Sequence, residues 1–357
     1  MRNTFGTRLT VTLFGESHGA EIGCVLDGLK PGLPVDAARI SDLLARRRPD
    51  GPTATARVEP DPFRIVSGVY QGRTTGAPLC ILIPNTQARS GDYRNLADTP
   101  RPGHADFTAF VKYRGFADPR GGGHFSGRLT APLVAAAGVV LPALEAGGIR
   151  IGTHLARCGG VADRGFSDLP ADLAALAHAP FPVLDPERGR AMREAILSAA
   201  EAGDSVGGVL ETAVTGLPAG LGAPWFDTVE GLLAHALFSI PAVKGVEFGA
   251  GFALADLRGS EADDPIRMDG DRVVTAANHN GGVNGGITNG MPLIVRTVVK
   301  PTPTIRTPRR TVSLASRSDA EITVHGRHDP AIAPRAAIVQ TAVTALVLCD
   351  LLAEAEG

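Results

Sequence analysis

Hydrophobic positions alternate with polar ones in some stretches of the chain and recur every three to four residues in others, which predicts a mixture of strands and helices. Alternation predicts strands over residues 8–14, 63–69, 78–83, 149–156, 207–215 and 292–299. The strands at 63–69 and 78–83 are expected to pair across the turn at 72–76. Helical spacing predicts helices from 36, where Asp36 is an N-cap, and over 129–144, 185–202, 227–237 and 334–354. Residues 159–185 are expected to be irregular, and 259–268 to be a polar loop.

The helix at 129–144 is apolar or small on nearly every face, which favours packing on several sides. In the first helix, Ile40, Leu43 and Leu44 form the apolar face. Arg39 and Arg46 lie seven residues apart, hence on one face of this helix, and Arg47 and Arg48 follow before Pro49. They suit the helix dipole, and they also suit an anionic ligand that guanidinium groups can bind bidentately.

Net charge, apolar runs and cysteine spacing each argue against certain classes of function. The net charge of −2 argues against nucleic acid as the main partner. We expect no apolar run of membrane-spanning length and no signal peptide. The four cysteines lack CxxC spacing, which is typical of a reducing cytoplasm and disfavours a structural zinc site.

The stretch 101–130 carries the strongest local signal for chemistry. A tight turn at 101–104 places His104 at a loop tip, and Gly121, Gly122 and Gly123 allow backbone to approach a ligand. The helix that follows Arg128 begins with free N–H groups, which suit an anion. The alternative interpretation is a glycine-rich surface connection beside a core helix.

Four further loops have the same character. Residues 15–19 present His18 on a turn, as either a functional or an ordinary polar residue, and 278–290 combine five glycines with four asparagines. Residues 300–304 place Lys300, one of only four lysines, between prolines and hydroxyls, which suits a phosphate. Residues 325–330 hold two histidines and Asp329 without metal-ligand spacing, which favours proton transfer over a metal site.

Nine segments in register resemble the chorismate synthase family over nearly the whole chain. They are GESHG (15–19), RRRP (46–49), SGVYQGRTTGAP (67–78), RPGHAD (101–106), RGGG (120–123), AVKGVEFG (242–249), GGVNGGITNG (281–290), KPTPT (300–304), and GRHDP with APRA (326–336). The resemblance implies one α/β sandwich domain over residues 1–357, with helices packed between antiparallel sheets, assembled as a cytoplasmic homotetramer.

That family converts 5-enolpyruvylshikimate 3-phosphate to chorismate and phosphate by an anti 1,4-elimination, the last common step before the aromatic amino acids. The resemblance implies a requirement for reduced FMN without net redox change, with NADPH involved only in reducing the flavin. It implies a small-molecule substrate, and neither nucleic acid nor a membrane as partner.

The resemblance also implies residue roles. His18 is expected to be a general acid at the departing phosphate, His104 to protonate or hydrogen-bond the flavin, and Asp329 to help remove the ring proton. The substrate-binding positions are Arg39, Arg46, Arg48, Arg101 and Arg128. The cofactor-binding positions are His124, Phe125, Ser126, Pro241, Ala242, Gly285, Lys300, Pro301, Thr302, Pro303, Thr304, Arg327 and, toward NADPH, Arg48.

The chain departs from the commoner family pattern at several of these positions. His124 and Phe125 stand where an arginine and a serine are usual, and Pro241 where asparagine is frequent. Two other classes remain as alternatives: a flavin-dependent oxidoreductase with net hydride transfer, and a non-catalytic FMN-binding protein. Against the oxidoreductase, the sequence shows no separate nicotinamide-binding fingerprint after a strand. Against the binding protein, a protein that only binds FMN has no need of His18, His104 and Asp329 together.

Overall fold

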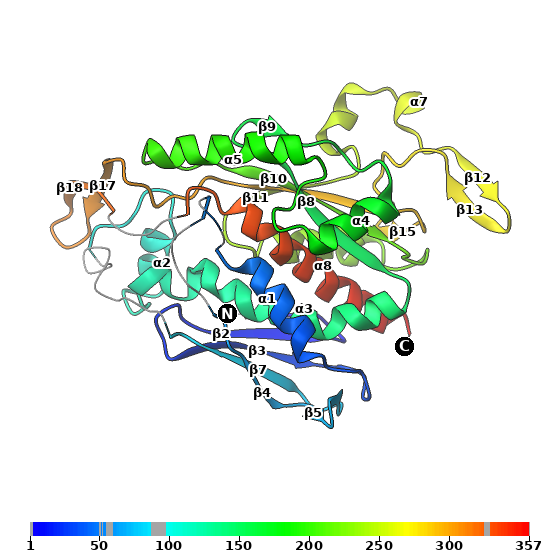
Figure 1. Cartoon of the computed structure of the whole chain (residues 1–357), viewed down its shortest axis with the longest axis horizontal. Coiled ribbons are helices and arrows are strands. Elements are labelled where there is room, and N and C mark those ends of the chain that lie inside the picture. Colours follow the sequence, from blue (N-terminus) through cyan, green and yellow to red (C-terminus); the bar gives the residue numbers. More distant parts are fainter. Residues whose placement is uncertain are drawn as a thin grey trace.

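Two five-stranded antiparallel sheets enclose a layer of helices in this computed structural model (Figure 1). The structure describes residues 3–49, 51, 53–54, 60–86, 98–324 and 329–356. The first sheet has the order β1-β2-β3-β7-β4, formed by β1 (Thr4–Phe5), β2 (Thr10–Gly15), β3 (Glu21–Asp27), β7 (Leu79–Pro84) and β4 (Arg64–Ser67). The second has the order β11-β16-β10-β8-β9, formed by β11 (Val243–Phe248), β16 (Leu293–Val299), β10 (Gly208–Thr215), β8 (Arg150–Cys158) and β9 (Val161–Ala162).

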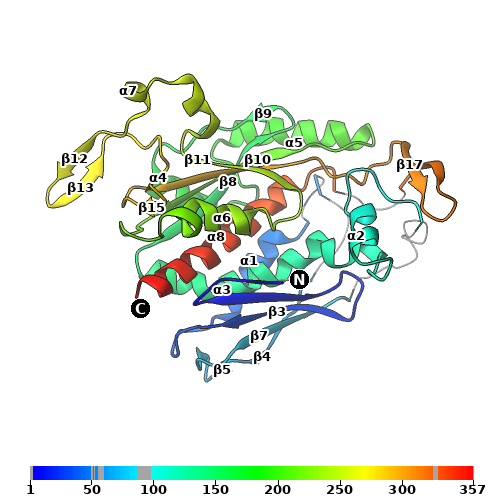
Figure 2. The same cartoon turned by 180° about the vertical axis from the view of Figure 1, so that it is seen from behind.

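Long helices fill the space between the sheets, as Figures 1 and 2 show. They are α1 (Ala37–Arg47), α3 (Thr130–Ala146), α6 (Val229–Leu237) and α8 (Ala333–Ala355). Two further helices, α4 (Leu169–His178) and α5 (Pro186–Glu201), pack on the other face of the second sheet. The expected sandwich of helices between antiparallel sheets is therefore confirmed, with this extra outer layer.

The remaining elements are short helices and two-stranded ribbons. The helical ones are α2 (Asp106–Lys112), α7 (Gly259–Ala262), η2 (Arg120–Phe125), η3 (Gly127–Leu129), η4 (Trp225–Asp227) and η5 (Gly251–Asp256). The two-stranded ribbons are β5 (Val69–Tyr70) with β6 (Arg73–Thr74), β12 (Ile266–Asp269) with β13 (Arg272–Thr275), β14 (Val283–Asn284) with β15 (Ile287–Thr288), and β17 (Arg309–Ser313) with β18 (Ser318–Ile322).

Helices α3 and α8 form the centre of the core. The stretch Gly127–Ala146, which runs from η3 through α3, and helix α8 are long and apolar enough to cross a membrane by length and composition, so the expectation that no run reaches that length is wrong. However, 78% of the apolar window of the first and 83% of that of the second are buried inside the structure. Their hydrophobicity is thus satisfied by packing. Helix α1 crosses α3 closely at Gly138, where a Cβ would lie 2.7 Å from Cγ1 of Ile40.

Charged side chains form a row across the outer face of the second sheet. Strand register places Glu247 beside Arg296, Arg296 beside Glu211, and Glu211 beside His154. The fully buried His154 has Asp163 Oδ2 at 2.9 Å from Nδ1 and Glu211 Oε2 at 3.0 Å from Nε2. Burial alone would lower the pKa of His154, but hydrogen bonds to the two carboxylates outweigh it and raise that pKa.

Some predicted boundaries are wrong. Residues 159–185 contain β9 and α4, because Asp168 caps the helix through Ala171 N (3.2 Å), and Leu173 and Leu176 are buried against the sheet. The loop predicted at 259–268 contains α7 and the start of β12. Thr228, and not Asp227, is the N-cap of α6, since its Oγ1 accepts from Gly231 N at 2.9 Å. The Asp36 and Asp185 caps are confirmed.

Candidate active site

One cavity of about 850 Å³ brings together four of the five loops that the sequence singles out, and no residue of the loop at 278–290 is among the described residues that line it. It is lined by the first turn of α3, the first half of α8, the connection from α6 to β11, and residues of β2. Segments 17–18, 101–105, 121–128 and 300–304 form its polar side. Segments far apart in sequence therefore meet at one place on the helix layer.

Two of the three consecutive glycines lie close to the rings of His18 and His104. Gly121, Gly122 and Gly123 all have positive φ, at 59°, 87° and 53°. A Cβ on Gly121 would lie 2.2 Å from Cε1 of His18, and one on Gly122 would lie 3.3 Å from Cε1 of His104. The expected close backbone approach is thus an approach to two imidazole rings, which both line the cavity.

His18 and His124 are both oriented by contacts with the turn at residues 15–19. Nδ1 of His18 lies 3.1 Å from Ser17 Oγ, and Ser17 N donates to Gly123 O at 3.1 Å. Nδ1 of His124 lies 2.8 Å from Gly15 O and therefore donates to it. The turn at 15–19 is joined in this way to the glycine segment.

Arg101 lines the cavity but is bound mainly by protein. Its Nε and Nη2 donate to Asp106 at 2.7 and 2.8 Å, and Nη1 donates to Thr304 Oγ1 at 3.2 Å. Burial opposes ionisation of Asp106, but hydrogen bonds from Arg101 and His104 hold its pKa well below the usual range. This pair joins the loop at 101–104 to the loop at 300–304, where Lys300 Nζ also donates to Gly103 O.

Arg128 and Arg47 share one buried carboxylate. Asp61 is 2% exposed, lies 2.8 Å from Nη2 of Arg47, and also accepts from Arg128. Arg128 Nε further donates to Asn85 Oδ1 at 3.1 Å. Both arginines line the cavity, so their charges are held in place at its wall.

The other predicted arginines of α1 contact protein elsewhere. Arg39 pairs with Glu145 at 2.7 Å, Arg46 donates to Leu176 O at 3.0 Å, and Arg48 donates to Pro60 O. Burial, followed by repulsion from Arg39, lowers the pKa of Arg46. None of the three is among the described residues that line the cavity.

The predicted cofactor positions divide into two groups. Those lining the cavity are His124, Phe125, Ser126, Pro241, Ala242, Lys300, Thr302, Pro303 and Thr304. Pro301 is not among the lining residues, and Gly285 lies at the β14–β15 turn beside the start of α6. Arg327 lies outside the described residues.

Sequence reasoning missed several polar residues of the cavity wall. Arg335 donates to Asp329 Oδ2 at 2.5 Å and, through Nε, to Arg47 O at 2.9 Å. Lys244, Asn85 and Ser17 also line the cavity. The APRA segment contains Arg335, and its place in the first turn of α8 was the available signal.

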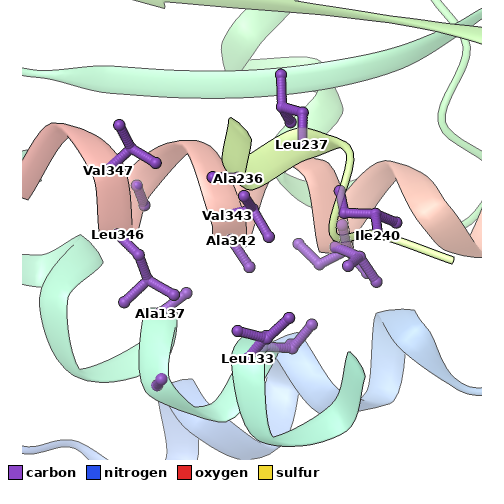
Figure 3. Close-up of a cluster of buried hydrophobic side chains, with 14 of the residues drawn as sticks. Leu133, Ala137, Ala236, Leu237, Ile240, Ala342, Val343, Leu346 and Val347 are labelled. Atoms are coloured by element: carbon purple, nitrogen blue, oxygen red, sulfur yellow. The ribbon is translucent and has the colours of Figure 1, made fainter. Parts of the chain in front are cut away.

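The cavity is strongly basic on its polar side and apolar at depth. Asp329 is the only carboxylate among the described residues that line it. Figure 3 shows Leu133 of α3, Ile240 after α6 and Val343 of α8 converging from three elements. Such a site suits a multiply anionic ligand beside an apolar or aromatic group. Histidines that line such a cavity are well suited to proton transfer, and this arrangement is typical of an enzyme active site.

Comparisons with known proteins agree over the full length of the chain. The chorismate synthase family model matches residues 9–353. The chain is 47% identical to chorismate synthase of Aeropyrum pernix over 98% of its length and 93% of the relative, and 43% identical to that of Dehalococcoides mccartyi over 98% and 96%. A crystal structure of chorismate synthase superposes with a TM-score of 0.78 at 30% identity, covering 99% of this chain and 94% of the other.

The chain belongs to the chorismate synthase family. It is therefore a lyase, as the resemblance in the sequence implied.

Proposed function

We propose that this protein converts 5-enolpyruvylshikimate 3-phosphate to chorismate and phosphate by an anti 1,4-elimination that requires reduced FMN without net redox change. The observation that carries the proposal is the placement of His18, His104 and Asp329 around one basic cavity. The substrate has a phosphate and two carboxylates, which match the excess of cationic side chains there.

The residues present fit a flavin. The apolar part of the cavity near Leu133 and Val343 suits a flat aromatic group. Lys300, Thr302 and Thr304 suit a phosphate. The volume lies near the upper end of the roughly 300–1,000 Å³ of small-molecule sites, which leaves room for a substrate beside a cofactor. When bound, reduced FMN would supply transient electron donation to the allylic system that loses phosphate.

The chain's own residues carry the proton transfers in this proposal. His18 donates a proton to the departing phosphate, and His104 holds a hydrogen bond or proton at the flavin. Asp329 accepts the ring proton, and Arg335 keeps its carboxylate in place. Charge neutralisation falls to the cavity-lining Arg47, Arg101, Arg128 and Arg335, while roles for Arg39 and Arg46 stay predictions.

NADPH would act only in reducing the flavin, and contact through Arg48 stays a prediction. We also propose a single domain over residues 1–357, since one hydrophobic cluster spans both sheets and the helix layer. A cytoplasmic location fits four free cysteines.

Self-association as a homotetramer is part of the proposal. The β12–β13 ribbon projects from the body in Figures 1 and 2. Its paired residues place Ile266, Met268 and Val273 on one side, and these are 76%, 60% and 61% exposed. Exposed apolar surface of this kind marks association sites. Light scattering of the purified protein, with Met268→Asp as the variant, tests it: a tetramer unaffected by the variant would place the interface elsewhere.

The decisive test is anaerobic incubation with the enolpyruvyl substrate and dithionite-reduced FMN. We expect chorismate absorbance and phosphate to appear together, with many turnovers per flavin. Product in proportion to oxidised flavin would indicate an oxidoreductase. Flavin binding without any product would indicate a binding protein.

A further inference from the structure

Asp106, the first residue of α2, contacts both the guanidinium of Arg101 and the imidazole of His104. Its Oδ1 lies 2.6 Å from His104 Nδ1 and 2.8 Å from Arg101 Nη2, and its Oδ2 accepts from Arg101 Nε at 2.7 Å and Arg101 N at 3.0 Å. The side chains of Asp106 and His104 are 12% and 17% exposed. His104 lines the cavity, whereas Asp106 is not among the described lining residues, so the carboxylate contacts the ring from outside the cavity wall.

The distances determine which ring nitrogen carries the proton. Two lone pairs 2.6 Å apart without a proton between them would repel strongly, so Nδ1 of His104 must donate to Asp106 Oδ1. Arg101 Nη2 is 3.1 Å from the same nitrogen, but a guanidinium only donates and has Oδ1 of Asp106 as its nearer acceptor.

The remaining nitrogen, Nε2, lies on the part of the ring that approaches the glycine segment. Nε2 of His104 lies 3.5 Å from the position that a Cβ on Gly122 would occupy, and His104 lines the cavity. With the proton on Nδ1, the neutral ring presents a lone pair at Nε2, so a proton can be accepted there and returned.

We propose that Asp106 is a positioning residue for the reaction: it fixes His104 as the Nδ1–H tautomer, so that Nε2 is the atom that exchanges protons in the cavity. This inference rests on the proposed role of His104. The same carboxylate holds Arg101, which is tied to Thr304, so its loss would also loosen the contact between two cavity loops. A test must therefore separate the tautomer from this structural effect.

The test uses full-length protein labelled with ¹⁵N in its nine histidines, with His104 assigned from the His104→Gln variant. In wild type at a pH where the ring is neutral, we expect Nδ1 to show the shift of a protonated nitrogen and Nε2 that of an unprotonated one. In Asp106→Ala and Asp106→Asn, the population should move toward Nε2–H. We expect kcat to fall about 10²-fold, with KM changed less than about threefold.

Asp172→Asn is the matched control, because Asp172 is also a buried carboxylate that binds an arginine (Arg164) and backbone N–H groups, far from His104. It should leave the His104 shifts and turnover unchanged. An Nε2–H tautomer in wild type, or an unchanged tautomer in both Asp106 variants, would overturn the inference even if turnover fell. If the Asp106 variants do not fold, the ¹⁵N shifts of His104 in wild type alone decide whether the neutral ring carries its proton on Nδ1. Normal turnover of His104→Gln would instead refute the proposed role of His104 and leave the tautomer result standing.

Discussion

Gly121 supports the ring of His18 so closely that residue 121 has no room for a side chain. A Cβ there would lie 2.2 Å from Cε1 and 2.4 Å from Nδ1 of His18. The glycine run is therefore part of the machinery that orients the proposed general acid.

We expect Gly121→Ala to displace His18 and lower kcat about 10²-fold, since a misplacement of about 1 Å can cost that much. Steady-state kinetics and a melting curve measure it. Gly72→Ala is the control, because Gly72 also has positive φ (71°) but nothing within 4 Å of its Cβ position. The control should lose about 1–2 kcal/mol of stability with ordinary turnover. Equal losses of turnover in both variants would mean that backbone strain, not the ring contact, matters.

His18→Ala and His104→Ala should each lower kcat by about 10²–10⁴-fold, the usual range for one general acid–base group, while FMN still binds. Turnover with reduced flavin and a flavin titration measure the two effects. His178→Ala, in the last turn of α4, is the control and should behave as wild type. A histidine variant that keeps more than half of the wild-type turnover would lose its assigned role.

Periodicity predicted the helices between the sheets and the pairing of β4 with β7, because buried positions recur in α1 and β7 with the expected spacing and α3 is apolar on nearly every face. It missed β3 (Glu21–Asp27) and the β12–β13 ribbon, whose form depends on partner strands. Motifs identified the loops that line the cavity. Which loops meet there depends on tertiary packing, which the sequence does not specify. Gly285, for example, was expected at the cofactor but lies at a turn beside α6.

The arginines of α1 show where a sequence argument could have gone further. Seven-residue spacing pointed to Arg39 and Arg46, yet Arg47 lines the cavity. Arg47 continues the buried stripe of Ile40 and Leu44, at helical spacing. A charge in such a stripe needs a buried partner, and Asp61 supplies it from a different segment.

Lys300→Ala should weaken FMN affinity more than it affects folding, because the ammonium adds positive charge beside the hydroxyls of Thr302 and Thr304. Flavin fluorescence quenching measures the affinity. Lys300 also donates to Gly103 O, so a structural role competes. Unchanged affinity with a lowered melting temperature would favour that role. Lys112→Ala, on α2, is the control for loss of a lysine. Arg327→Ala is predicted to act as Lys300→Ala does.

The charge row on the second sheet predicts a pH dependence of stability. Because the pKa of folded His154 is raised above its unfolded value of about 6.5, the folded state holds an extra proton above that pH. The contribution of His154 to the free energy of unfolding is fully present below pH 6.5 and is lost as pH rises through the folded pKa. Its slope is at most about 1.4 kcal/mol per pH unit.

Urea unfolding from pH 6.5 to 9 measures this slope. We expect His154→Gln to be less stable than wild type at pH 6.5 and to have a shallower dependence on pH, while His178→Gln keeps the wild-type slope. Parallel curves for wild type and His154→Gln would show that His154 does not hold the extra proton.

Asp329 precedes Pro330 and pairs with Arg335 at 2.5 Å, so it has a structural as well as a catalytic interpretation. As an ordinary turn residue it would hold backbone and guanidinium in place, and its loss would cost about 1 kcal/mol. As the base it would face the ring proton of the substrate. Asp329→Asn separates these roles, because asparagine keeps the size and an oxygen for Arg335 but cannot serve as a carboxylate base.

The base role predicts that Asp329→Asn folds and binds flavin and substrate, yet turns over at least about 100-fold more slowly. A turn role predicts near-normal turnover, since the asparagine oxygen can still accept from Arg335. Substrate deuterated at the ring carbon that loses its proton sharpens the distinction. If proton removal becomes rate-limiting in the variant, its isotope effect on kcat should exceed that of wild type. Ordinary turnover with an unchanged isotope effect would assign Asp329 to the turn and require another base in the cavity.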